Sequence, residues 1–250
     1  ISPDPEPRLE LPYFVYQNKF YSFGDFFSGK INRVLEFDPA NKTWEQFYLP
    51  ELATDTSAGS PVAKHAFAQG RLYICDYGSP TTNNFAYIDV FSQTPEWTEL
   101  EIHGLSCDGS FNAAVYGEKF WFESGGSFYY VDLLTETMTQ VSELNLCCGK
   151  GVRAKNFYYW ISSGETLRLD LDNISSGWES LTAAPEILNI NSQTNFSIAF
   201  DGDATIYLRG RKGDTSSEEV IYALNTDDHV WTRKAGNGPS ARNHHSMVYY

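Results

Sequence analysis

The stretch that decides the fold is Val34-Leu-Glu-Phe-Asp38, followed six residues later by Trp44. An alternating apolar segment ends at an acidic residue, a short polar turn follows, and an aromatic residue opens a second extended segment. The same arrangement recurs four more times with drift, which indicates a repeated structural unit. The aligned pairs are Asp38 and Trp44, Asp89 and Trp97, Asp132 and Met138, Asp170 and Trp178, and Asn225 and Trp231.

Both positions of the recurring pair have a structural role. An Asp or Asn side chain can bond the turn backbone two residues further on. A Trp can fill the wedge between neighbouring sheets and bury about 150–250 Å². The aromatic positions are 53, 41, 40 and 53 residues apart. These spacings bracket the roughly 40–50 residues of one propeller blade.

A hairpin of two aromatic-rich segments precedes each pair, so each unit predicts four strands. No window keeps a helical period, and turn-forming residues interrupt the chain about every ten residues. A pair of immunoglobulin-like sandwiches also has many short strands, but it does not explain the repeated pair. We therefore expect one all-β domain, residues 1–250, that is a propeller of four-stranded antiparallel blades. The expected blades span residues 13–49, 65–102, 111–144, 152–182 and 196–234.

One more strand is expected over residues 244–250, after the fifth blade. It would be the inner strand of a sixth blade, to which residues 8–12 would add a closing outer strand. Because propellers hide their sheet edges by closure, we expect the native polypeptide to continue past Tyr250 with about two more strands. A five-bladed ring with a supernumerary strand is the alternative.

The last segment, Gly238-Pro-Ser-Ala-Arg-Asn-His-His-Ser-Met-Val-Tyr-Tyr250, resembles the entry into a kelch repeat, where an Arg and a His precede the innermost strand. Arg242 and His245 match that pattern, and the Asp-turn-Trp endings also resemble kelch blades. The family's diglycine survives only as Gly125-Gly126, displaced into a short loop. The resemblance covers nearly the whole chain and is greatest to secreted or membrane-tethered fungal propellers of the galactose-oxidase type. It implies a kelch-like propeller.

The net charge of −14 would repel a phosphate backbone and an anionic membrane surface, so nucleic acid is not an expected partner. No stretch reaches the roughly 18 apolar residues of a membrane-spanning helix, so no direct membrane insertion of this segment is expected. The start at Ile1 without a leader fits a mature secreted product or a trimmed chain. Sequons at Asn41, Asn173 and Asn195 could carry glycans. We expect a secreted or cell-surface protein.

Four cysteines allow three disulfide pairings and lack the spacing of metal ligands. They are Cys75, Cys107, Cys147 and Cys148. A bridge from Cys107 to Cys147 or Cys148 is favoured, because these residues lie in loops that enter neighbouring repeats. Buried free thiols are the alternative.

In such blades the loops between strands two and three emerge on the same face as the links between blades, which makes that face the default binding site. Asp25 and Phe26 lie in one of these loops and would suit a sugar or a peptide, although the aromatic ring could instead pack beneath the loop. Arg209 and Arg211 form a basic spot in another of these loops, residues 209–219, which could receive an acidic partner or remain a solvated loop tip. Lys64, Arg153 and Arg242 enter inner strands, where they could line the central channel or tie loops together. The full predicted set is Asp25, Phe26, Arg33, Lys64, Tyr77, Arg153, Arg209, Arg211 and Arg242.

The sequence gives little evidence of a catalytic site. The galactose-oxidase resemblance implies a copper-radical site with a Tyr-His dipeptide, and no such dipeptide occurs. His244 and His245 are adjacent on an expected strand, so their side chains point to opposite faces. Neither a nucleophile elbow, a phosphate loop nor zinc spacing is present. We therefore expect a recognition module without cofactor or metal that binds a protein or glycan. A kelch-type oxidase or lyase and a structural wall or filament component are the alternatives.

Overall fold

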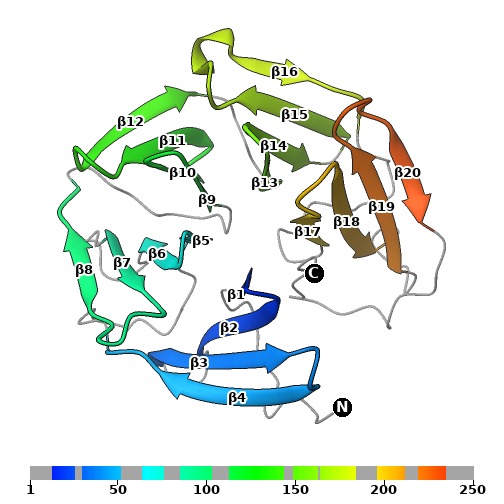
Figure 1. Cartoon of the computed structure of the whole chain (residues 1–250). Helices are drawn as coiled ribbons and strands as arrows, with labels where there is room; N and C mark the ends of the chain where they lie inside the picture. The colour runs from blue at the N-terminus through cyan, green and yellow to red at the C-terminus, as the bar shows by residue number, and fades with distance from the viewer. Residues whose placement is uncertain are drawn as a thin grey trace. The chain divides into compact units, whose positions relative to one another are not determined.

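The computed structural model describes residues 13–25, 30–51, 64–75, 85–102, 113–143, 149–162, 164–183, 196–211 and 219–234. Within these ranges lie twenty strands and one short 3₁₀ helix. The strands form five four-stranded sheets, and each sheet keeps its strands in chain order (Figure 1). The predicted all-β class with four-stranded antiparallel blades is confirmed. The extra strand 244–250 and the closing strand 8–12 lie outside the described residues.

The first blade contains β1 (Tyr13–Tyr16), β2 (Lys19–Asp25), β3 (Lys30–Asp38) and β4 (Thr43–Tyr48). The second contains β5 (Lys64–Ala68), β6 (Arg71–Cys75), β7 (Phe85–Asp89) and β8 (Trp97–Leu100). The third contains β9 (Ala113–Tyr116), β10 (Lys119–Ser124), β11 (Ser127–Asp132) and β12 (Thr137–Ser142). The fourth contains β13 (Lys150–Ala154), β14 (Phe157–Ser162), β15 (Glu165–Asp170), the 3₁₀ helix η2 (Ile174–Ser176) and β16 (Trp178–Ser180). The fifth contains β17 (Phe196–Phe200), β18 (Thr205–Arg211), β19 (Glu219–Asn225) and β20 (Trp231–Lys234).

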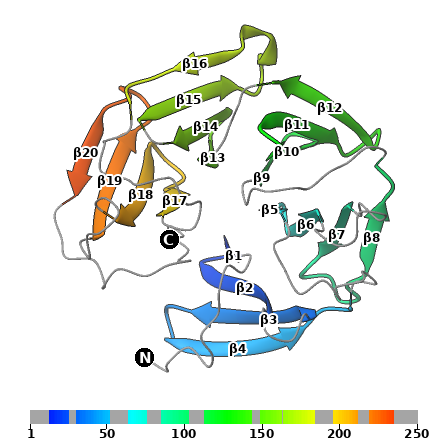
Figure 2. The ribbon, with the colours of Figure 1, turned by 180° about the vertical axis from the view of Figure 1, so that it is seen from behind.

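An antiparallel meander places successive connections at alternating ends of the sheet. We call the end with the first-to-second and third-to-fourth connections the turn end. The opposite end of the same blade, which carries the second-to-third connection and the links to other blades, is the loop end. Figure 2 shows the same strands from behind.

Tight turns close several of these hairpins. At the turn end of the first blade, Gln17 and Asn18 have φ values of 48° and 60°. At the loop end of the third blade, Gly125 and Gly126 have φ values of 57° and 82°. Two consecutive residues with positive φ are typical of a type I′ turn, whose twist matches that of the flanking strands. The diglycine is therefore used as a tight hairpin turn.

The Asp or Asn at the end of each third strand fixes the turn that follows it. In every blade its Oδ1 accepts a hydrogen bond from the backbone N–H two residues on, as predicted. These bonds join Asp38 to Ala40 (2.8 Å), Asp89 to Phe91 (3.3 Å), Asp132 to Leu134 (3.0 Å), Asp170 to Asp172 (3.0 Å) and Asn225 to Asp227 (2.8 Å).

The aromatic residue that opens the fourth strand ties its blade to the preceding one. The indole Nε1 donates to an oxygen at or just after the preceding fourth strand in three blades. These bonds run from Trp97 to the Pro50 carbonyl (2.9 Å), from Trp178 to the Ser142 hydroxyl (3.0 Å) and from Trp231 to the Thr182 carbonyl (3.3 Å). The predicted wedge role is confirmed for these three indoles. Met138 instead packs against the apolar cluster between the second and third blades.

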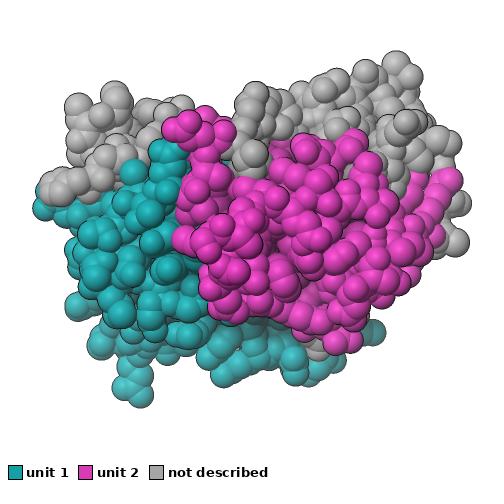
Figure 3. Space-filling model, turned by 90° about the horizontal axis from the view of Figure 1, so that it is seen from above, with its two compact units in different colours: residues 1–124, 129–140, 250 teal, residues 125–128, 141–249 magenta. Residues whose placement is uncertain are grey.

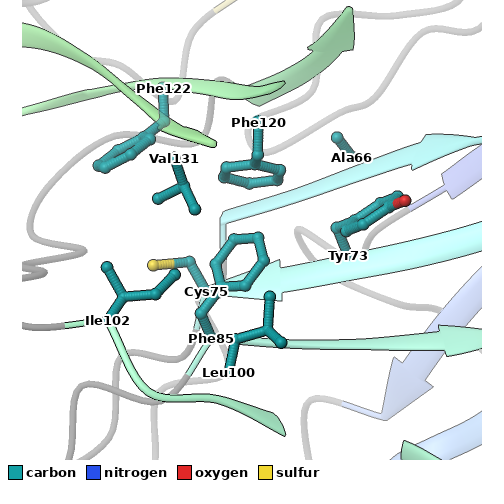
Figure 4. Packing of buried hydrophobic residues seen from close by; sticks show 9 residues of the cluster. All are labelled: Ala66, Tyr73, Cys75, Phe85, Leu100, Ile102, Phe120, Phe122 and Val131. Carbon is teal, nitrogen blue, oxygen red and sulfur yellow. The ribbon is translucent and has the colours of Figure 1, made fainter. Parts of the chain in front are cut away.

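Apolar side chains fill the space between consecutive blades. Figure 4 shows one such cluster, in which Phe85 of the second blade meets Phe120 of the third with ring centroids 4.8 Å apart. Another cluster joins the first two blades, and a third joins the fourth and fifth. Between the third and fourth blades, Phe128 lies against Tyr158 and Trp178, at centroid distances of 4.6 and 5.3 Å. Each of these contacts buries apolar surface that one sheet could not cover alone.

The chain divides into two compact units (Figure 3). One comprises residues 1–124, 129–140 and 250, and the other residues 125–128 and 141–249. The first unit contains the packing among the first three blades. The second contains the fourth and fifth blades together with Phe128 of the third. No helix in the described part of the chain is long and apolar enough to cross a membrane.

Replacing Gly151 by alanine is expected to destabilise the fourth blade. An added Cβ would overlap the hydroxyl and ring of Tyr158, which is fully buried and cannot move without disturbing Phe128. We expect Gly151→Ala to lower the free energy of unfolding by about 1–3 kcal/mol, measured by urea denaturation. Adding Tyr158→Phe should recover part of the loss that Gly151→Ala causes, because the overlapping hydroxyl is gone. Native stability of the single variant would contradict this packing.

The turn after β11 predicts a dependence of stability on acid. Backbone hydrogen bonds from Thr135 and Leu134, both 3.0 Å long, lower the pKa of the Asp132 carboxyl below its ordinary value. A carboxyl with a lowered folded pKa stabilises the fold above its unfolded pKa of about 3.9, and the contribution is lost as the pH falls through the folded pKa. Between about pH 5 and pH 2, the unfolding free energy of the native chain should therefore decrease more than that of Asp132→Asn.

The matched control is Leu134→Ala in the same turn, which keeps the Asp132 carboxyl and both backbone N–H donors. It should keep the native slope of stability against pH. Equal slopes for the native chain and Asp132→Asn would show that the charge at Asp132 does not contribute.

Candidate functional site

The loop ends of the blades differ from one another much more than the turn ends do. In the first, second and fifth blades the second-to-third connections span residues 26–29, 76–84 and 212–218. The third and fourth blades use only two residues each, 125–126 and 163–164. Because a regular sheet carries variable connections at this end, the loop end is the candidate site for recognition.

An ordered set of polar and aromatic side chains lies at the loop end of the first blade. Arg33 and Tyr48 are cross-strand neighbours at the ends of β3 and β4 nearest the loop end. The Arg33 Nε donates a hydrogen bond of 2.8 Å to the Gln46 Oε1, and the Gln46 Nε2 donates one of 2.5 Å to the Tyr48 hydroxyl. The Tyr48 side chain is held in place although it is 62% exposed. We call Arg33, Gln46 and Tyr48 the Tyr48 triad.

The triad results from the alternation of side chains along β4. Trp44, Gln46 and Tyr48 are two residues apart, so they share one face of the sheet. Phe47 points to the other face and packs against the cluster between the first and second blades. One strand therefore buries Phe47 while it presents Gln46 and Tyr48 to solvent.

Tyr48 differs in its location from the other exposed apolar side chains of the described residues. Phe91, Leu134 and Val230 belong to third-to-fourth connections, at the turn ends of their blades. Tyr48 lies on a strand at a loop end, where its ring is held by a hydrogen bond. A fixed, exposed aromatic ring next to an amide and a guanidinium can stack on a ligand and hydrogen-bond to it at the same time.

Three buried polar atoms without hydrogen-bond partners also lie toward the loop ends. They are the side-chain oxygens of Asn32, Thr166 and Ser197. Asn32 and Thr166 lie near the start of a third strand and Ser197 near the start of a first strand, and both kinds of strand begin at the loop end. Buried polar groups normally bond to protein or ordered water.

Two predicted basic residues lie in a strand and not in a loop. Arg209 and Arg211 belong to β18, where Arg209 is opposite Ser197 and Ile221. The expectation of a loop tip is therefore wrong for both, because the hairpin of β18 and β19 continues to Arg211 and Glu219. Arg33 likewise lies within β3. All three remain close to the loop ends of their own blades.

Arg153 lies near the turn end of the fourth blade. Its guanidinium donates a hydrogen bond of 2.7 Å to the Lys155 carbonyl, within the turn that joins β13 to β14. This contact lies within one hairpin, whereas the alternative given by the sequence was a tie between loops. It gives Arg153 a role in holding its own hairpin.

The remaining predicted residues lie at strand ends or outside the described part of the chain. Phe26, Tyr77 and Arg242 lie outside the described residues, as do Cys107, Cys147, Cys148 and Asn195. Asp25 is the last residue of β2 and does not lie in the loop where it was expected, because its pairing with Lys30 extends the hairpin. Lys64 begins β5, so the backbone places both Asp25 and Lys64 at loop ends. Cys75 is completely buried and disulfide-bonded, with its partner outside the described residues.

Hydrogen bonds within the blades account for the shifted pKa values of Lys19 and Asp201. At the turn end of the first blade, a hydrogen bond with Glu36 raises the pKa of Lys19. In the fifth blade, burial would raise the pKa of Asp201, but N–H groups of Thr205, Asp203 and Ala204 lower it overall. The described residues include no group of three or more His, Cys, Asp or Glu side chains that could hold a metal ion.

Sequence reasoning identified Arg33 but not Gln46 or Tyr48. The repeated pair ends at Trp44, the second residue of β4, and does not include the residues after it. The signal that could have identified them is the two-residue alternation from Trp44 through Gln46 to Tyr48.

Comparison with known proteins identifies the architecture. No family model and no curated protein matches the sequence, so the kelch family is not confirmed. Among solved structures, 339 chains match. One is the structure of YjhT, a propeller protein, with a TM-score of 0.66 and 14% sequence identity over 98% of this chain and 88% of that chain. The fold is a β-propeller, and the described residues form five of its blades. At this identity the likeness concerns the fold alone.

Proposed function

We propose that this propeller is a recognition module that binds a protein or glycan through the loop ends of its blades. The observation that carries the proposal is the Tyr48 triad, in which two hydrogen bonds hold an exposed ring at a loop end. Ordering these side chains before binding reduces the entropy that a ligand must offset. The Tyr48 triad therefore has its side chains ordered before a ligand binds.

The chemistry of the triad suits both proposed ligand classes. A tyrosine ring can stack on the apolar face of a sugar or on a peptide side chain, while its hydroxyl remains available for hydrogen bonds. An amide and a guanidinium can bond to hydroxyl, carboxylate or peptide groups. Tyrosine and arginine are also enriched among the residues that dominate binding energy at interfaces.

The charge of the chain limits the classes of partner that we propose. With 18 basic against 32 acidic residues, the chain is unfavourable for nucleic acid. Arg33 and Arg209 place positive charge near the loop ends of the first and fifth blades. A ligand with acidic groups would be attracted to either positive charge, whereas the acidic residues elsewhere on the chain repel other anions.

A secreted or cell-surface location and a kelch-like type of propeller belong to the same proposal. The resemblance of residues 238–250 to a kelch repeat supports the type. Sequons and cysteines support export, since disulfides persist in oxidising compartments. Disulfide mapping of the secreted protein tests the predicted link from Cys107 to Cys147 or Cys148.

The test of the proposed function is binding to glycan and protein arrays. Once a ligand is found, Tyr48→Ala should weaken binding at least tenfold, about 1.4 kcal/mol, because the stacking surface is lost. Leu134→Ala is the matched control, since it truncates a 75% exposed side chain at a turn end. It should bind as the native protein does.

Two results would contradict the proposal. One is native affinity of Tyr48→Ala, which would remove the triad from the site. The other is that the protein binds nothing on the glycan or protein array but converts a small molecule catalytically. The propeller fold is compatible with interaction modules and enzymes, so the second result would establish the enzymatic alternative.

A further inference from the structure

Two sequons occupy corresponding places in their blades. Asn41 lies in the connection between β3 and β4, and Asn173 lies in the connection between β15 and β16. Both are third-to-fourth connections, so each asparagine lies at the turn end of its own blade. The third sequon, at Asn195, is outside the described residues.

Both asparagines are accessible to a bulky substituent. Asn41 and its neighbours Lys42 and Thr43 are exposed, as are Asn173 and Ser175. Hydrophilic, exposed connections at sheet edges tolerate added groups, because no packed side chain must move. The same motif on a buried strand would be unusable in the folded protein.

The local hydrogen bonds are compatible with modification of the amide nitrogen. The Asn41 Nδ2 donates a bond of 2.9 Å to the Asp38 Oδ2. A side-chain amide has two N–H groups, so replacing one hydrogen leaves the other available for this contact. At the second site the Ser175 hydroxyl donates to the Asn173 Oδ1 at 2.8 Å. That bond draws electron density toward the carbonyl and leaves Nδ2 unblocked.

We propose that Asn41 and Asn173 are N-glycosylated, and that in these two blades the glycans leave the turn end while the loop end remains open to ligand. In the reaction, Nδ2 forms a bond to the anomeric carbon of a lipid-pyrophosphate-linked oligosaccharide. The bond from that carbon to the pyrophosphate oxygen breaks, and Nδ2 loses one proton. The glycans would cover the exposed turns of these blades and leave the Tyr48 triad, at the loop end of the first blade, uncovered.

This inference rests on the export included in the proposed function, but it does not depend on the identity of the ligand. The chain is expressed in eukaryotic cells behind a signal peptide. Glycopeptides from secreted and cell-retained protein are then treated with peptide N-glycosidase in ¹⁸O-labelled water. Each occupied asparagine becomes a labelled aspartate, which peptide mass spectrometry locates. Label is expected at both Asn41 and Asn173, and its absence from both overturns the proposal.

Matched variants separate the sequon from the asparagine. Thr43→Ala and Ser175→Ala should each remove label from one site only, whereas Thr43→Ser should retain it. Retained label after loss of the hydroxyl would overturn the assignment to these sequons. The mass of each peptide shows whether its asparagine carried a glycan, so this test needs no binding assay.

The placement of the glycans has its own test. The double variant Thr43→Ala with Ser175→Ala should bind any array ligand within twofold of the glycosylated native protein. A loss of binding in this double variant would overturn the claim that the glycans lie away from the ligand. Failure of the proposed function is read separately, from the effect of Tyr48→Ala on a protein whose glycans are intact.

Discussion

The structure depends on burial of large side chains between consecutive sheets. A four-stranded meander presents two faces, and it becomes stable when neighbouring sheets cover its apolar surface. Here Phe120 and Tyr158 are completely buried because each packs against the blade that precedes it in the chain. Indole hydrogen bonds fix the outer part of three contacts between consecutive blades. Trp97 bonds the second blade to the first, Trp178 the fourth to the third, and Trp231 the fifth to the fourth. These contacts between sheets support the turns and loops at both ends of the blades.

The two ends of each blade then serve different purposes. At every turn end an Asp or Asn bonds the backbone that follows the third strand, and the third-to-fourth connections have four to seven residues. At the loop ends the second-to-third connections range from two residues to nine, as in residues 76–84. Tyr48 and its partners lie at the loop end of the first blade.

Much of the fold followed from the sequence because its repeated pairs have local causes. The hydrogen bond from Asp132 to Leu134 depends only on residues two apart, so a pattern search can find it. The candidate site was harder to predict. The Tyr48 triad depends on the register that puts Arg33 opposite Tyr48 and on exposure that no local pattern reveals. Arg209 was assigned to a loop for the same reason, since the extent of strand pairing is a tertiary property.

The most direct test of the account is a double-mutant cycle across the contact between the third and fourth blades. Phe128 and Trp178 meet edge to face, 5.3 Å apart, and belong to different sheets. Unfolding free energies of Phe128→Leu, Trp178→Leu and the double variant isolate their interaction. We expect a favourable coupling of about 0.5–1.5 kcal/mol. Additive effects, with no coupling beyond error, would contradict the claim that packing between blades supports the structure.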